Sequence, residues 1–153
     1  MKKKSPSHVL LRNPGLRGWE YGMLRELEHE IVKQTNATVI DIPEYHNNIL
    51  VKKSAHGMRL DKVRSVLPKK TLQVDADVIW FILMGPENHV LDLFSQWDIK
   101  AKHRIVYLFD TLPPQYSLVK KLYSNDQFNI RITSFTDAVP DLESITGKKW
   151  FAI

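Results

Sequence analysis

Acidic and hydroxyl side chains follow the last two long apolar runs of this sequence. Asp110 and Thr111 come directly after one run, and Ser134 and Asp137 come after the next. A carboxylate at the end of a strand can orient a substrate hydroxyl, or act as a general base when burial raises its pKa. Asp110 is therefore the candidate catalytic residue, and the other three are candidates for binding a ligand. Helix capping is the competing interpretation, because Asp, Ser and Thr are common at helix N-termini.

Glycines and acidic side chains follow two earlier apolar runs. Gly15, Gly18 and Glu20 lie between the first run and the first amphipathic stretch, and Gly85 and Glu87 follow the third run. Glycine lets backbone amides approach a ligand, and the start of the next helix favours an anion. The spacing is neither the dinucleotide GxGxxG pattern nor a Walker loop. These five residues are further candidates for ligand binding, and simple turns are the alternative.

Several other chemistries lack a pattern in this sequence. The histidines show no paired metal-ligand spacing, no cysteine is present, and no serine sits in a GxSxG elbow. A receiver domain would need an acidic cluster after the first strand, where this chain has Asn13. We therefore expect no metal, no cofactor, no hydrolase triad and no phosphoacceptor site.

The elements that must position these residues alternate between strands and helices. Apolar runs predict strands at 8–12, 38–42, 77–84, 104–109, 128–133 and 150–153. Apolar residues at helical spacing predict helices around 24–31, 90–97, 113–122 and 137–146. Thr136 or Asp137 should cap the last helix, Pro140 should lie in its first turn, and Gly147 should end it. We assign no element between Glu44 and Gln73.

This alternation predicts an α/β fold. We expect a single doubly wound, mostly parallel sheet of five or six strands with helices on both faces, a Rossmann-like architecture. Ligands of such sheets bind outside the carboxyl ends of the strands, which is why residues at those positions are the candidates.

Composition and charge limit the number of domains and the kinds of partner that we expect. With 153 residues, 43% of them hydrophobic, the chain is sized for one domain over 1–153, with residues 1–7 as a flexible basic tail. The longest apolar run, from Val78 to Met84, is too short to cross a bilayer. The net charge of +5 comes from scattered lysine pairs without an aromatic-interleaved stripe, so we expect no nucleic-acid partner.

The C-terminal part of the sequence resembles a known family. The run His103-Arg-Ile-Val-Tyr-Leu-Phe109, the following Asp110-Thr-Leu-Pro-Pro114 and the segment from Ser134 to Gly147 are similar to the second half of the N-terminal Rossmann-like domain of GT-B glycosyltransferases, glycosyltransferase family 4-like. The similarity covers 104–153, and 8–33 more loosely. The sequence departs from the family in having no histidine in the run 77–84.

The resemblance implies an activity and its partners. Such a domain is the acceptor-side half of an enzyme that moves a sugar from a nucleotide-sugar donor to an acceptor hydroxyl, and it is inactive without a C-terminal donor-binding domain. A sugar or lipid-linked acceptor implies a cytoplasmic protein with peripheral contact at the inner face of the membrane. The alternative is a stand-alone Rossmann-like module that binds a protein or an anionic partner. In an incomplete enzyme we expect Trp150, Phe151 and Ile153 to be partly uncovered.

Overall fold

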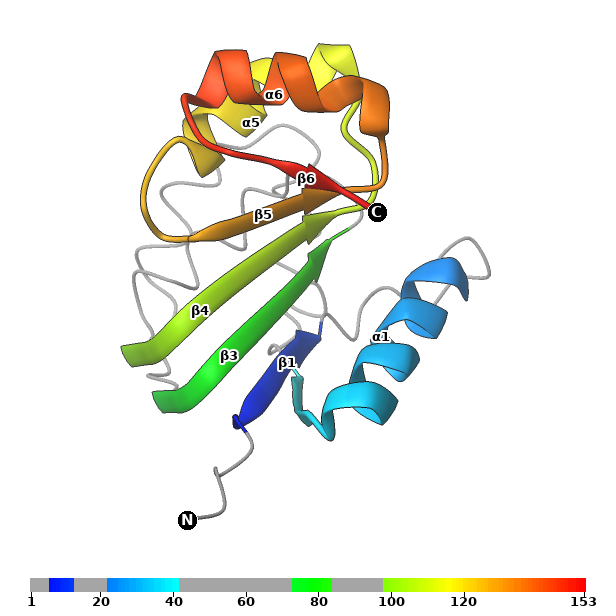
Figure 1. Cartoon of the computed structure of the whole chain (residues 1–153), viewed down its shortest axis with the longest axis vertical. Helices are drawn as coiled ribbons and strands as arrows, with labels where there is room; N and C mark the ends of the chain where they lie inside the picture. Colours follow the sequence, from blue (N-terminus) through cyan, green and yellow to red (C-terminus); the bar gives the residue numbers. More distant parts are fainter. Residues whose placement is uncertain (1–5, 13–21, 42–72, 84–97) are drawn as a thin grey trace, which may run out of the picture.

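A computed structural model describes residues 6–12, 22–41, 73–83 and 98–153. These residues contain a six-stranded sheet in which all paired strands are parallel, in the order β2-β1-β3-β4-β5-β6 (Figure 1). Its strands are β1 (His8–Arg12), β2 (Thr38–Asp41), β3 (Gln73–Leu83), β4 (Asp98–Leu108), β5 (Ile130–Thr133) and β6 (Phe151–Ala152). The helical elements are α1 (Gly22–Thr35), η3 (Pro113–Gln115), α5 (Tyr116–Tyr123), η4 (Thr136–Ala138) and α6 (Val139–Thr146). The predicted α/β fold with a parallel sheet is confirmed.

Helices cover both faces of this sheet. The α1 helix lies against one face, while α5 and α6 lie together on the opposite side (Figure 1). Alternation along the strands explains this: Leu10 packs with Leu24 of α1, whereas Leu11 belongs to the larger core that includes Val119 of α5 and Leu142 of α6. The predicted doubly wound arrangement is therefore present, with an apolar core on each face.

The strand order reverses direction between β1 and β3. The chain runs from β1 to β2 on one side and later returns to place β3 on the other side of β1. Ligands of open α/β sheets bind at such a switch point, outside the carboxyl ends of the strands. The carboxyl ends of β1 and β3 lead directly into 13–21 and 84–97, which lie outside the described residues.

The two central strands are longer than the apolar runs predict. β3 begins at Gln73 rather than Asp77, and β4 begins at Asp98 rather than Arg104. In their first halves exposed residues alternate with more buried ones, so only the continuously buried second halves read as apolar runs. Ser7, which the sequence places in the basic tail, pairs with β3: its amide and hydroxyl donate to the Asp77 carboxylate at 2.7 and 2.9 Å.

The last helix starts differently from the prediction. Neither Thr136 nor Asp137 caps it, because both belong to the short turn η4, and the N-cap position is Ala138 without a side-chain hydrogen bond. Pro140 does lie in the first turn, and Gly147 ends the helix with a left-handed φ of 64°. That conformation suits glycine because a β-carbon would approach the following carbonyl oxygen.

An aromatic cluster anchors the C-terminal segment to the core. Trp150 packs against Tyr123 with ring centroids 6.3 Å apart, and Tyr123 in turn packs against Phe128 at 5.7 Å. The Trp150 indole donates to the Thr146 hydroxyl at 3.0 Å, and the Trp150 backbone amide donates to the Glu143 carboxylate. The expectation that Trp150 would be partly uncovered is wrong, since it is fully buried, whereas Phe151 and Ile153 are exposed.

Candidate functional site

The predicted site residues that the structure describes lie at the carboxyl ends of two adjacent strands. Asp110 and Thr111 follow β4, and Ser134 and Asp137 follow β5. The parallel register pairs Leu108 with Thr133, so both strands end at the same level of the sheet. The other candidates, Gly15, Gly18, Glu20, Gly85 and Glu87, lie outside the described residues.

Thr111 takes part in a buried contact with a residue that sequence reasoning missed. Its hydroxyl lies 2.6 Å from the hydroxyl of Thr133, and both residues are buried. The Thr133 hydroxyl also accepts a hydrogen bond from the backbone amide of Phe135 at 3.2 Å. Thr133 had no sequence signal beyond its place at the end of a strand. The contact joins the segments that follow β4 and β5, and it uses the Thr111 hydroxyl inside the protein.

The hydroxyl of Ser134 is also used inside the protein. Its hydroxyl donates to the carbonyl oxygen of Phe109, and its backbone amide donates to the carbonyl of Leu108 at 3.4 Å. Burial raises the pKa of the Tyr107 phenol, and Ser134 offsets part of that rise. Thr111 and Ser134 thus hold the two strand ends together.

Asp110 and Asp137 are the two acidic residues of this edge. Asp110 is half-buried and Asp137 is exposed on η4. Within the part of the chain that the structure describes, neither carboxylate makes a hydrogen bond or an ion pair with a protein group. A half-buried carboxylate without a protein partner is available to accept a hydrogen bond from a ligand hydroxyl. Asp110 is therefore the side chain of this edge that is best placed for chemistry.

Exposed apolar side chains lie beside these acidic residues. Leu112 is 49% exposed, Phe135 is 40% exposed and Ile153 is 75% exposed, and they follow β4, β5 and β6 respectively. We call these three residues the apolar rim. A signal was present in the sequence for two of them, because Leu112 and Phe135 each interrupt a polar segment directly after a strand.

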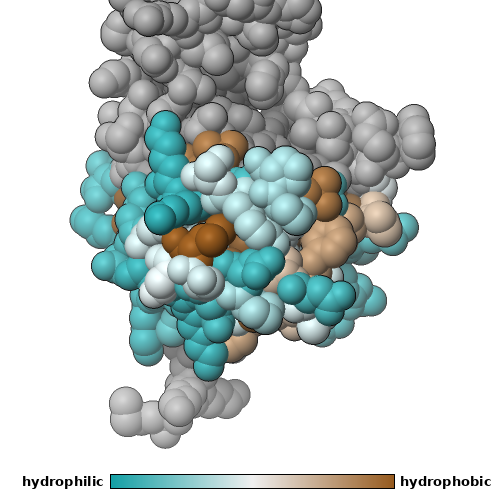
Figure 2. Space-filling model, turned by 90° about the horizontal axis from the view of Figure 1, so that it is seen from above, coloured by the Kyte–Doolittle hydropathy of each residue, from teal (hydrophilic) through white to brown (hydrophobic). Residues whose placement is uncertain are grey.

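The outer surface of α5 and α6 has a different character from the apolar rim. Seen from above, it is mostly hydrophilic, with small apolar patches between charged and polar side chains (Figure 2). Charged residues of α5, among them Lys120 and Lys121, are exposed to solvent. This face therefore reads as an ordinary solvated surface.

A second group of charged residues lies at the carboxyl ends of β1 and β2. Arg12 ends β1 and Asp41 ends β2, and the register places them opposite each other. The Arg12 guanidinium donates from Nε and Nη2 to the two carboxylate oxygens of Asp41, at 2.6 and 3.0 Å. Such a bidentate pair has a fixed geometry, although both side chains are about half exposed.

Glu28 of α1 belongs to the same group. It is only 9% exposed, and burial raises the pKa of its carboxyl, while the charges of Arg12 and Arg25 lower it and Asp41 raises it further. Sequence reasoning missed Glu28, because acidic residues of an amphipathic helix normally lie on its solvent face, as Glu26 and Glu30 do. Its position four residues after the buried Leu24 was the available signal.

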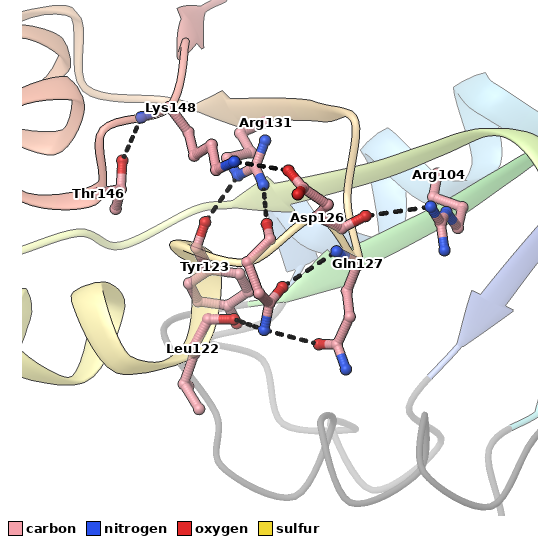
Figure 3. Close-up of polar contacts among 9 residues, drawn as sticks. Arg104, Leu122, Tyr123, Asp126, Gln127, Arg131, Thr146 and Lys148 are labelled. Carbon is pink, nitrogen blue, oxygen red and sulfur yellow. Dashed lines mark hydrogen bonds and ion pairs between the residues drawn. The ribbon is translucent and has the colours of Figure 1, made fainter.

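A polar network at the opposite, amino ends of the strands stabilises the fold. The buried Arg131 guanidinium donates to the carbonyls of Tyr123 and Asn125, at 2.9 and 2.5 Å, and so satisfies backbone groups at the end of α5 (Figure 3). Beside it, Lys148 pairs with Asp126 at 2.6 Å, and Arg104 donates to the Asp126 carbonyl at 3.1 Å. These contacts fix the connection before β5 and lie at the amino ends of the strands.

Comparison with known proteins gives no relative. No protein-family model, no curated protein and no solved structure matches the chain. Within the described ranges, no group of three or more His, Asp or Glu side chains is arranged to hold a metal ion, and no helix is long and apolar enough to cross a membrane.

Proposed function

We propose that this chain is the acceptor-side domain of a glycosyltransferase that moves a sugar from a nucleotide-sugar donor to an acceptor hydroxyl. One observation carries the proposal: Asp110 presents a half-buried carboxylate, which has no partner among the described residues, at the carboxyl edge of a doubly wound parallel sheet. Ligands of such sheets bind at this edge. The resemblance of 104–153 to GT-B glycosyltransferases supports the same assignment.

In this reaction Asp110 acts as the general base. The acceptor O–H bond breaks and its proton passes to the Asp110 carboxylate, while the oxygen forms a new bond to the anomeric carbon of the donor. The bond between that carbon and the nucleotide diphosphate breaks, and its electron pair leaves with the phosphate. Thr111 and Ser134 keep the loop that carries Asp110 in place through their internal hydrogen bonds.

The apolar rim supports the need for a second domain. Leu112, Phe135 and Ile153 expose apolar area after β4, β5 and β6, at the same edge as Asp110, and a donor-binding domain closing on this edge would cover them and exclude water from the reaction. Alone, the chain should bind an acceptor but transfer no sugar. A lipid-linked acceptor would bring the complete enzyme to the inner face of the membrane as a peripheral cytoplasmic protein.

A binding experiment tests this assignment on the purified chain. Saturation-transfer NMR with a panel of methyl glycosides should detect binding to the wild type and a loss of about tenfold or more with Asp110→Asn. Asp98→Asn is the matched control, because Asp98 is an exposed aspartate at the other end of the same strand. Equal binding by the two variants would remove Asp110 from the site, and absence of any glycoside binding would overturn the proposal.

The second candidate function is that of a stand-alone binding module. The apolar rim favours this candidate as well. A module of this kind would use Leu112, Phe135 and Ile153 to hold a protein partner. The mass of the native gene product in extracts of its source cell separates the two candidates. A species more than twice the 17.8 kDa of this chain supports the transferase, and a species at 17.8 kDa supports the module.

A further inference from the structure

We propose that Arg104, Arg131 and Lys148 form a binding site for a phosphate group at the amino ends of β5 and β6. We call these three residues the cationic cluster. They converge on two adjacent residues of the loop before β5, Asn125 and Asp126 (Figure 3). The inference goes beyond the proposed function and does not depend on it, because the cluster uses none of the residues at the carboxyl edge of the sheet.

The first support is the closeness of the three positive charges. The Lys148 ammonium lies 2.6 Å from the Asp126 carboxylate, and the Arg104 guanidinium donates from Nη2 to the Asp126 carbonyl at 3.1 Å. Arg131 donates from Nη2 to the carbonyl of Asn125 at 2.5 Å. Figure 3 shows Asp126 between Arg104 and the other two cations. The cationic cluster therefore surrounds one short piece of backbone.

The second support is an excess of positive charge. Among the described residues, Asp126 is the one carboxylate that contacts the cationic cluster, so three cations face a single negative charge. The pKa of its carboxyl is lowered by the hydrogen bond and the charge of Lys148, and further by the charges of the two arginines. Arg131 is buried, and its hydrogen bonds go to backbone carbonyls. Because a buried charge is costly without an opposite charge nearby, a bound anion would be favoured here.

The third support is the donor capacity that Arg104 and Lys148 retain. A guanidinium has five N–H donors, and the hydrogen bond from Arg104 to Asp126 uses one of them. Its Nε atom is buried and has no hydrogen-bond partner among the described residues. Lys148 has three N–H donors, and in the described part of the chain its ammonium donates to Asp126 only. Both side chains can therefore donate to the oxygen atoms of an anion.

The loop that carries Asp126 is held in place by asparagine side chains. Asn129 accepts a hydrogen bond from the backbone amide of Arg104 at 2.8 Å and donates to the carbonyl of Lys102 at 2.7 Å, which joins the loop to β4. The side-chain oxygen of Asn125 accepts from a backbone amide of the same loop at 3.1 Å. An anion would meet donors that are already in position, which lowers the entropic cost of binding.

The charge and the donor types of the cluster select a phosphate group. A cation would be repelled, and a neutral hydroxyl would leave the excess charge uncompensated. Guanidinium groups match the geometry of phosphate oxygens, and an ammonium adds a compact positive charge. A phosphate monoester carries about two negative charges at neutral pH, which balances the excess. Arg104 and Lys148 would contact the phosphate, and the buried Arg131 would act through its charge. A network that only stabilises the fold is the alternative.

An NMR titration of the isotope-labelled chain with inorganic phosphate tests the site. We expect saturable shifts of the backbone amides of Asp126 and Lys148, with a Kd on the order of 1 mM. Sodium chloride at the same ionic strength is the reference, because it screens charges without occupying a phosphate site. Equal shifts with the two salts, or shifts that do not saturate with phosphate, would overturn the proposal.

Two substitutions with opposite expected effects separate a phosphate site from a network that only stabilises the fold. Lys148→Gln removes a donor and should weaken phosphate binding about fivefold or more, whereas Asp126→Asn removes the competing carboxylate and should strengthen it about threefold or more. Lys149→Gln and Asp98→Asn make the same changes of net charge at exposed neighbouring positions and should each alter affinity by less than about twofold. Unchanged or weaker binding by Asp126→Asn would overturn the site, even if Lys148→Gln does not fold.

Discussion

The hydroxyl groups of Thr111 and Thr133 lie 2.6 Å apart in the core, at the point where β4 and β5 end. The contact is a side-chain link between two parallel strand ends, added to the backbone ladder between them. It also sets the position of the segment that carries Asp110, because Thr111 is the next residue.

Removal of one of these hydroxyls should destabilise the fold. Thr133→Val leaves the buried Thr111 hydroxyl without its partner, which costs about 1–3 kcal/mol of the free energy of unfolding. The double variant with Thr111→Val should lose less than the sum of the two single losses, since both groups are then apolar. Urea denaturation of the four proteins measures the coupling, and additive losses would show that the two hydroxyls act independently.

Replacement of Arg131 should be among the most destabilising single changes. Arg131→Met removes the donors that satisfy the carbonyls of Tyr123 and Asn125, and we expect a loss of about 3 kcal/mol in the free energy of unfolding. Lys120→Met on the exposed face of α5 is the control and should change stability by less than about 0.5 kcal/mol. Similar urea midpoints for the two variants would contradict a structural role for the network in Figure 3.

The pKa of Glu28 predicts how stability changes with pH. Because burial raises this pKa in the folded state, the native protein binds a proton more tightly than the unfolded chain in the range above 4.5, the ordinary pKa of a glutamate. Stability should therefore fall as the pH rises from about 4.5 through the folded-state pKa, and level off above it. Urea midpoints measured across this range should show a smaller fall for Glu28→Gln than for the wild type. Glu30→Gln should follow the wild type.

Alanine substitutions at two glycines should differ in their effect on the stability of the protein. At Gly147, φ is 64° and a β-carbon would meet no atom within 4 Å, so Gly147→Ala is penalised by backbone conformation alone, by about 1 kcal/mol. Gly22 has equally open space and begins α1, so Gly22→Ala should be neutral or stabilise the protein by up to about 1 kcal/mol. Thermal unfolding followed by circular dichroism measures both changes. A destabilised Gly22→Ala protein would contradict the helical conformation at that position.

The fold was more predictable than the site, for physical reasons. A strand that is covered on both faces shows as an unbroken apolar run, so the second halves of β3 and β4 could be read from residues such as Ile79 and Val106. The first halves alternate polar and apolar residues and were missed. Asp137 shows the limit of capping rules, because a single 3-10 turn before the helix moved the cap to Ala138.

The site depended on contacts between residues that are distant in sequence. Thr111 meets Thr133 only because β4 and β5 are neighbours, and the charge of Arg12 acts on Glu28 only because α1 packs against β1 and β3. Neither pair has a local pattern that marks it. Position after a strand made Asp110 a candidate, because the rule for parallel sheets concerns the strand end and not a particular partner, and its role stays a prediction.

The strand order also has a consequence for synthesis on the ribosome. β1 is made first but lies between β2 and β3, so the edge of β1 that faces β3 has no partner until Gln73–Leu83 has emerged. During that interval the nascent chain exposes an open strand edge with apolar residues on both faces, which is the form most prone to pair with other chains. Chaperone protection of the nascent chain should therefore matter most before β3 has left the exit tunnel.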